Sequence, residues 1–179
     1  MRKIGYSGKL DEAYGIRILL DAFSLIEDPE LQLWVTGSGR LMEIVKEREE
    51  KDRRIRFLGL LENRDLVLQM EEEADVLVNP RLPSNPLSDF SFPSKLFEYL
   101  LSGTPVVSFR IGGIPEDYFP YLYLAERETP EALSSAILKA LSLSREACLR
   151  RGRAAQRFIR EEKSPREAAE KIWTFVRSL

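Results

Sequence analysis

The chain has 179 residues, a formal charge of −2 at pH 7, one cysteine and no histidine. This length suits one domain with its own core, and the balanced charge argues against a nucleic-acid-binding protein, which would show a basic face. Without histidine, the chain cannot form a Ser-His-Asp triad, a Cys-His pair or a histidine metal site. Any chemistry must therefore rely on carboxylates, on Lys and Arg, and on backbone dipoles.

Strands and helices are predicted to alternate along the chain. Short apolar runs bounded by polar or turn residues indicate strands, and apolar residues at helical spacing indicate helices. The strands are expected at residues 3–7, 31–36, 55–58, 76–79, 106–109 and 121–124. The helices are expected at residues 12–26, 40–51, 65–73, 93–102, 130–143, 144–161 and 165–178, with a loop rich in Pro and Ser at 81–92.

This alternation predicts the fold class. Short apolar strands between helices indicate a parallel sheet covered on both faces, so we expect an α/β fold with a doubly wound, Rossmann-like sheet of about six strands. Ligands bind such sheets at the carboxyl ends of the strands, near the point where the strand order reverses. The loops at those ends begin at Ser7, Thr36, Leu58, Asn79 and Phe109. The chain shows neither an internal repeat nor a linker, so residues 1–179 are predicted to form a single domain.

Few features of the sequence point to a particular compartment. The single cysteine, Cys148, excludes an internal disulfide and any zinc site made of cysteines. The sequence contains no apolar run long enough to span a bilayer and does not open with a signal peptide, so we expect a cytoplasmic protein.

The most informative stretch is residues 92–107, FPSKLFEYLLSGTPVV. Pro93 suits the first turn of a helix, and Gly103 suits its end. The N-terminus of a helix offers free N–H groups and a partial positive charge, which suits a phosphate, and Ser94 adds a hydroxyl there. Glu98 follows four residues later, about 6 Å along the helix, where it could hold ribose hydroxyls. The stretch therefore predicts a nucleotide site.

The same stretch resembles the signature of the family 4 retaining glycosyltransferases, in the variant Pro-Ser-Lys-Leu-Phe-Glu-Tyr followed by Gly-x-Pro-Val-Val. In those two-domain GT-B enzymes the signature lies in the C-terminal domain, which holds the nucleotide-sugar donor. Further blocks in the order of the family follow at residues 6–10, 35–39, 55–59, 74–80 and 112–116. The resemblance implies that a sugar is transferred from a UDP-, GDP- or ADP-sugar to an acceptor hydroxyl, with retention and without a cofactor. It also implies that no metal is used, and the sequence lacks the Asp-x-Asp pattern of the other large glycosyltransferase fold.

The resemblance assigns the donor site residue by residue. Lys9 would bind the diphosphate and stabilise the charge that develops on the leaving group, while Glu98 would bind the ribose hydroxyls. These two residues are the predicted catalytic pair. For Lys95 two alternatives stay open, since it could face the pocket or form a salt bridge with Glu98. The full predicted donor site is Gly8, Lys9, Gly37, Phe57, Leu58, Ser94, Lys95 and Glu98, with Phe57 and Leu58 lining the base pocket.

Two positions depart from the pattern of the family. Tyr14 stands where a second lysine usually binds the diphosphate, and Phe90 stands where a further glutamate contacts the donor sugar. Arg17 or Arg40 could replace the missing cation. The departures favour an alternative in which the chain is a non-catalytic nucleotide-sugar-binding module. A second alternative is half of another GT-B-type enzyme, such as a sugar-nucleotide epimerase, although those enzymes usually recruit histidines.

The length of the chain suggests a missing half. Family enzymes also carry an N-terminal, acceptor-binding domain of similar size, whereas here the first predicted strand begins at Lys3. We therefore expect an excised half or a separate subunit that is inactive without that domain. The expected partners are the nucleotide-sugar and the missing domain, without nucleic acid, and any membrane contact would run through the missing domain. Trp34, Phe97 and Trp173 are expected in the core.

Overall fold

The computed structural model describes residues 2–177, apart from the side chains of Arg145, Pro165, Ala168 and Lys171. It contains one six-stranded sheet whose strand order is β3-β2-β1-β4-β5-β6, and every neighbouring pair is parallel. The strands are β1 (Arg2–Lys9), β2 (Leu31–Ser38), β3 (Ile55–Phe57), β4 (Val76–Asn79), β5 (Val106–Phe109) and β6 (Leu122–Ala125). The predicted α/β class with a doubly wound sheet is confirmed.

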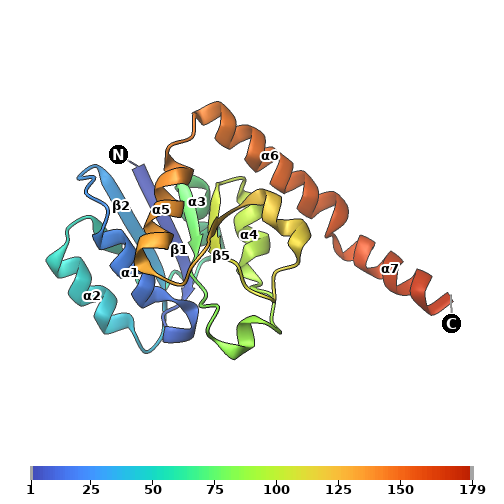
Figure 1. Cartoon of the computed structure of the whole chain (residues 1–179), viewed down its shortest axis with the longest axis horizontal. Coiled ribbons are helices and arrows are strands. Elements are labelled where there is room, and N and C mark those ends of the chain that lie inside the picture. Colours follow the sequence, from blue (N-terminus) through green and yellow to red (C-terminus); the bar gives the residue numbers. More distant parts are fainter. Residues whose placement is uncertain (1, 178–179) are drawn as a thin grey trace.

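Helices cover both faces of this sheet (Figure 1). On one face α1 packs against α5, and on the other α3 packs against α4, which in turn contacts α6. The helices are α1 (Ile16–Ser24), α2 (Met42–Lys51), α3 (Arg64–Glu73), α4 (Lys95–Ser102), α5 (Pro130–Leu141), α6 (Arg145–Glu162) and α7 (Pro165–Arg177). The apolar strand residues between the two layers, such as Ile4, Leu33 and Val106, are fully buried and form the core.

The strand order reverses between β1 and β4. The chain adds β2 and β3 on one side of β1, and then returns to place β4 on the other side. Since the loops that follow β1 and β4 leave in opposite directions, a crevice opens at their carboxyl ends. The fold thus directs a ligand to the loop after β1 and to the helices that border it.

The first predicted helix, at residues 12–26, is wrong in its detail. One 3₁₀ turn (Glu12–Tyr14) comes first, and α1 begins only after Gly15, whose φ is 72°. A Cβ at Gly15 would lie 1.8 Å from the carbonyl oxygen of Pro80. The chain therefore bends at a position that only glycine suits, because the loop after β4 packs directly against it.

The end of the chain also differs from the prediction. Trp173 was expected in the core, but its exposed fraction is 59%. It lies on α7, which extends away from the sheet (Figure 1). Trp34 and Phe97 are half-buried, and Phe97 packs against the core. The predicted last residue of the final helix, Ser178, lies outside the described residues. Among the described helices, we find none whose length and apolar character would let it cross a membrane.

Candidate functional site

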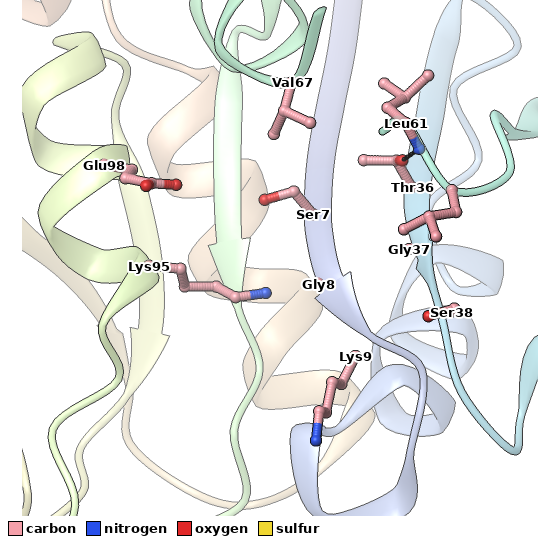
Figure 2. A pocket seen from close by; sticks show the side chains of 11 residues that line it. Ser7, Gly8, Lys9, Thr36, Gly37, Ser38, Leu61, Val67, Lys95 and Glu98 are labelled. Atoms are coloured by element: carbon pink, nitrogen blue, oxygen red, sulfur yellow. Dashed lines mark hydrogen bonds between the residues drawn. The ribbon is translucent and has the colours of Figure 1, made fainter. Parts of the chain in front are cut away.

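A cavity of about 360 Å³ opens at the carboxyl ends of β1 and β2 (Figure 2). Its walls come from these two strands, the loop after β3, and helices α3 and α4. The lining residues are Ser7, Gly8, Lys9, Thr36, Gly37, Ser38, Leu60, Leu61, Val67, Lys95 and Glu98. The structure thus brings Gly8, Lys9, Gly37, Lys95 and Glu98 together in one place, at the edge of the sheet that the sequence pattern predicts.

Two glycines form the backbone floor of this cavity. Gly8 and Gly37 are opposite one another in the β1–β2 register, and their φ angles are 141° and 142°. A Cβ at Gly37 would lie 1.7 Å from the carbonyl oxygen of Gly8. Both the backbone conformation and the close approach of the strands therefore require glycine at these two positions.

Lys95 is a buried cation directed at this floor. Figure 2 shows its side chain reaching from α4 toward β1, and a Cβ at Gly8 would lie 1.8 Å from its Nζ. The Nζ lies 4.4 Å from the ring centroid of Tyr6 and, in the part of the chain that the structure describes, has no hydrogen-bond partner. Burial lowers the pKa of Lys95 to about 8, although Glu71 and Glu98 act in the opposite direction. Of the two alternatives for Lys95, the structure shows the one that faces the pocket.

An ammonium group in such surroundings favours an anionic ligand. A buried charge without a partner costs free energy, and an oxygen anion in the cavity would supply the missing hydrogen bonds. The two aromatic rings nearby stabilise the cation only in part.

Glu98 faces the same cavity from one turn further along α4 (Figure 2). Its Oε1 accepts a hydrogen bond from Nη2 of Arg64 at 3.0 Å, at the rim of the cavity. Because the Arg64 side chain is 75% exposed, this ion pair is worth little and can open when a ligand hydroxyl competes for the carboxylate.

Lys9 supplies a second cation at the mouth. Its side chain is exposed and points beyond the end of β1 (Figure 2). The hydroxyl of Tyr6 donates to the carbonyl oxygen of Lys9 at 2.5 Å, which fixes the end of the strand. Lys95 therefore lies against Gly8 while Lys9 lies at the mouth of the same cavity, a distribution of charge that suits an extended anion such as a diphosphate.

A buried polar network lies behind the wall of the cavity. Oε1 of Glu71 accepts a hydrogen bond from Oγ of Ser7 at 2.8 Å, and the backbone N–H of Ser7 donates to the hydroxyl of Tyr99 at 2.9 Å. Sequence reasoning missed Glu71, because the run Glu71-Glu72-Glu73 is typical of a solvated helix surface. Its spacing of four residues from Val67 could have placed it on the buried face.

Three predicted residues do not line the cavity. Ser94 is exposed, and its side chain does not cap α4. Phe57 and Leu58 were expected at the base pocket, but they line a different cavity beside Trp34 and Arg56. The physical reason is a turn at Gly59 with a φ of 67°, after which Leu60 and Leu61 reach the site.

The two departures from the family pattern lie outside the cavity lining. The side chain of Phe90 is 89% exposed, and Tyr14 is half-buried beside Gly15. Neither possible replacement cation reaches the cavity, because Arg17 pairs with Glu12 at 2.8 Å and Arg40 pairs with Asp11 at 3.0 Å. The two cations that line the cavity are Lys9 and Lys95.

The doubly wound sheet, with a cavity at the carboxyl ends of its strands, corresponds to half of a GT-B fold. The chain belongs to the family of glycosyl transferases group 1, whose pattern matches residues 1–143. Its relatives include a human component of phosphatidylinositol N-acetylglucosaminyltransferase, which is 30% identical over 116 residues. That match covers 63% of this chain but only 22% of the human protein.

Solved structures share the fold at low sequence identity. TarM from Staphylococcus aureus, solved with UDP, fondaparinux and α-GlcNAc-glycerol, has a TM-score of 0.80 and 18% identity, and the match covers 97% of this chain and 35% of TarM. HepE from Anabaena, solved with UDP and glucose, has a TM-score of 0.75 and 19% identity, with 99% of this chain and 48% of HepE covered. The C-terminal domain of LpcC from Francisella tularensis has a TM-score of 0.74 and 18% identity, with 92% and 87% covered.

Proposed function

We propose that this chain is the donor-binding domain of a glycosyltransferase, and that it binds a nucleoside-diphosphate sugar for transfer to an acceptor hydroxyl. The observation that carries the proposal is the convergence of Lys9, Lys95 and Glu98 on one cavity floored by Gly8 and Gly37. Two cations suit the diphosphate, and a carboxylate one helical turn away suits the ribose.

The proposed reaction proceeds with retention and without a metal. The acceptor oxygen would attack the anomeric carbon on the face from which the nucleotide leaves, as the bond between that carbon and the diphosphate oxygen breaks. Lys9 and Lys95 would stabilise the charge that develops on the departing diphosphate. What supports a metal-independent reaction is this pair of cations, whose positive charge would be available to the diphosphate.

The proposed domain works with a second, acceptor-binding domain. The matched segment is 35% of TarM, 48% of HepE and 22% of the human relative, so each of those proteins has further chain beyond it. HepE was solved with UDP and glucose and TarM with UDP, which supports a nucleotide-sugar as the donor here. The donor would supply the base and the sugar, and the second domain would select the acceptor.

Ligand-observed NMR with UDP, GDP and ADP tests the proposal. At least one nucleotide should bind, with an affinity that EDTA leaves unchanged. Replacement Glu98→Gln should weaken that binding by about 1–3 kcal/mol, the range for hydrogen bonds to a charged group. Glu161→Gln, an exposed change on α6, serves as the matched control and should bind as the unmodified chain does.

Three outcomes separate the possibilities. If none of the three nucleotides binds, the donor-domain proposal is wrong, while the fold stands. If binding is lost in EDTA, the metal-independent reaction is wrong. If a nucleotide binds but no sugar is transferred when an acceptor domain is supplied, the chain is a non-catalytic binding module.

A further inference from the structure

Glu71 is a carboxyl group enclosed in the wall of the candidate donor cavity. Its side chain has an exposed fraction of 0%. One oxygen, Oε1, accepts the hydrogen bond from Ser7, while the buried Oε2 meets no hydrogen-bond partner among the described residues. A buried carboxylate with one unpaired oxygen is costly, and the neutral acid is much cheaper to bury.

The carboxyl group is tied to the site through short contacts. Ser7 lines the cavity and immediately precedes Gly8. The backbone of Glu71 is held as well, because Oγ1 of Thr104 donates to its carbonyl oxygen at 2.9 Å. A change in the charge of Glu71 therefore changes the electrostatic potential directly behind the surface on which a diphosphate would lie.

Charged and titratable groups interact with Glu71 from two elements, and they are Arg64 on its own helix and Lys95, Glu98 and Tyr99 on α4. Tyr6 on β1 contacts Lys95, whose Nζ lies 4.4 Å from the centroid of its ring. The pKa of Glu71 is raised to about 7, chiefly by burial and in smaller part by the charge of Glu98. The Ser7 hydrogen bond and the cations Lys95 and Arg64 act in the opposite direction. Burial also raises the pKa of both tyrosines, which stay neutral where Glu71 titrates.

We propose that Glu71 is a positioning residue that couples the uptake of one proton to the binding of the donor diphosphate. In its neutral form it holds the Ser7 hydroxyl and leaves Lys95 free to pair with the anion. In its ionised form it competes for Lys95 and repels the anion. The step takes one proton from solvent onto Oε2 and changes no bond of the ligand. The inference rests on the proposed function, since it requires a diphosphate in the cavity.

Thermodynamic linkage gives the sign of the effect. A bound diphosphate places negative charge near Glu71, which favours its protonated form and raises its pKa. By reciprocity, the affinity for the diphosphate must fall as the pH rises through the pKa of Glu71. Lys95 loses its own proton nearer pH 8, so the contribution of Glu71 is measured below that pH.

Calorimetry across this pH range tests the inference. The probe is the tightest binder among UDP-glucose, UDP-N-acetylglucosamine, GDP-mannose and ADP-glucose, whose diphosphate diesters do not titrate here. Between about pH 6 and pH 7.4, the affinity of the unmodified chain should fall about two- to threefold, which is the part of the effect of a pKa shift of half a unit to one unit that develops in this range. Titrations in two buffers of different ionisation enthalpy should show net proton uptake.

Matched variants identify the group that takes up the proton. Glu71→Gln should bind with an affinity that falls less across this range and should show a smaller proton uptake, which then comes from Lys95 alone. Glu72→Gln removes an exposed carboxylate from the next position of α3 and should behave as the unmodified chain does. An equal fall in affinity in the unmodified chain and in Glu71→Gln would overturn the inference.

Two further outcomes are distinguishable. If none of the four sugar nucleotides binds, the proposed function itself is wrong. If Glu71→Gln does not fold, carboxyl NMR titration of the unmodified chain still decides, because the glutamate that titrates near neutral pH can be followed with and without ligand. A pKa for that group that does not rise when the ligand binds would overturn the inference.

Discussion

At the scale of single residues, burial of ionisable groups gives the candidate site its character. Lys95 and Glu71 are both enclosed by the packing of α3 and α4 against β1, and each keeps a polar atom without a hydrogen-bond partner within the described structure. Burial alone would drive both groups toward their neutral forms, whereas their mutual attraction favours the charged forms. Burial of these groups lowers the stability of the folded chain, and it leaves a cation available to bind an anion.

Replacement Glu71→Gln should therefore stabilise the chain, and increasingly so as the pH rises. The pKa of Glu71 is raised from 4.5 to about 7 in the folded state, so its contribution to stability is fully present below pH 4.5 and is lost as the pH rises toward 7. The glutamine side chain of the variant cannot ionise, so the variant does not lose this stability as the pH rises. Its advantage in the free energy of unfolding should be small at pH 5 and about 1–3 kcal/mol at pH 8.

Urea unfolding of both proteins at these two pH values measures the difference. Glu72→Gln is the control, and as an exposed change it should shift the free energy of unfolding by less than about 0.5 kcal/mol at either pH. A gain for Glu71→Gln that is the same at pH 5 and pH 8 would contradict a titrating Glu71.

At the scale of elements, the paired ends of β1 and β2 shape the floor of the cavity. Gly8 and Gly37 lie opposite one another, and the N–H of Gly37 also donates to the carbonyl oxygen of Gly59 at 2.9 Å. This contact joins the loop after β3 to the site and brings Leu60 and Leu61 into the lining. The cavity thus depends on three strand ends that must pack without side chains between them.

Replacement Gly37→Ala should disrupt this packing. Its Cβ would meet the Gly8 carbonyl oxygen at 1.7 Å, at a φ that disfavours any L side chain, so we expect a loss of stability of about 3 kcal/mol or more and weaker nucleotide binding. Gly59→Ala is the matched control, because it also has a positive φ but its Cβ would meet nothing within 4 Å. It should cost about 1–2 kcal/mol, the strain of the left-handed conformation alone. Equal losses in thermal or urea unfolding would show that steric contact at Gly37 is unimportant.

At the scale of the whole molecule, the proposed function requires one further surface beside the cavity. The cavity is open to solvent at the carboxyl ends of the strands, and a transfer reaction requires a donor and an acceptor enclosed together. Helix α7 leaves the body of the domain (Figure 1). It carries exposed apolar side chains, including Ile172, Trp173 and Val176. Exposed apolar groups of this kind favour association with another protein surface.

We therefore expect the isolated chain to bind a nucleotide, to transfer no sugar, and to self-associate through exposed apolar surface. Sedimentation should show association that weakens in Trp173→Ser, whereas Lys46→Ser, an exposed change on α2, should leave it unaltered. Activity should appear only when an acceptor domain is supplied in cis or in trans. Robust transfer by the 179 residues alone would contradict this and would place an acceptor site within them.

The sequence by itself determined the order of strands and helices and the edge of the sheet where the site lies. β4 and β5 begin and end as predicted, because short apolar runs between polar residues are local signals. Glu98, Gly8 and Gly37 could be assigned to the site from the sequence, because each belongs to a short local pattern. Gly8 and Gly37 lie at the ends of apolar strands, and Glu98 lies in the signature stretch. The resemblance of the blocks in order then predicted a glycosyltransferase, and the match of residues 1–143 to the glycosyl transferases group 1 confirms that broader class.

Only the tertiary structure decided which side chains share the cavity. Glu71 resembles a solvated glutamate until α3 packs on β1, and Lys95 had two alternatives until α4 directed it at Gly8. Phe57 and Leu58 lie elsewhere because Gly59 turns the chain, and Trp173 is exposed because α7 leaves the domain. Each of these outcomes depends on contacts between segments distant in the sequence, and such contacts leave no periodic signal in the residues that make them.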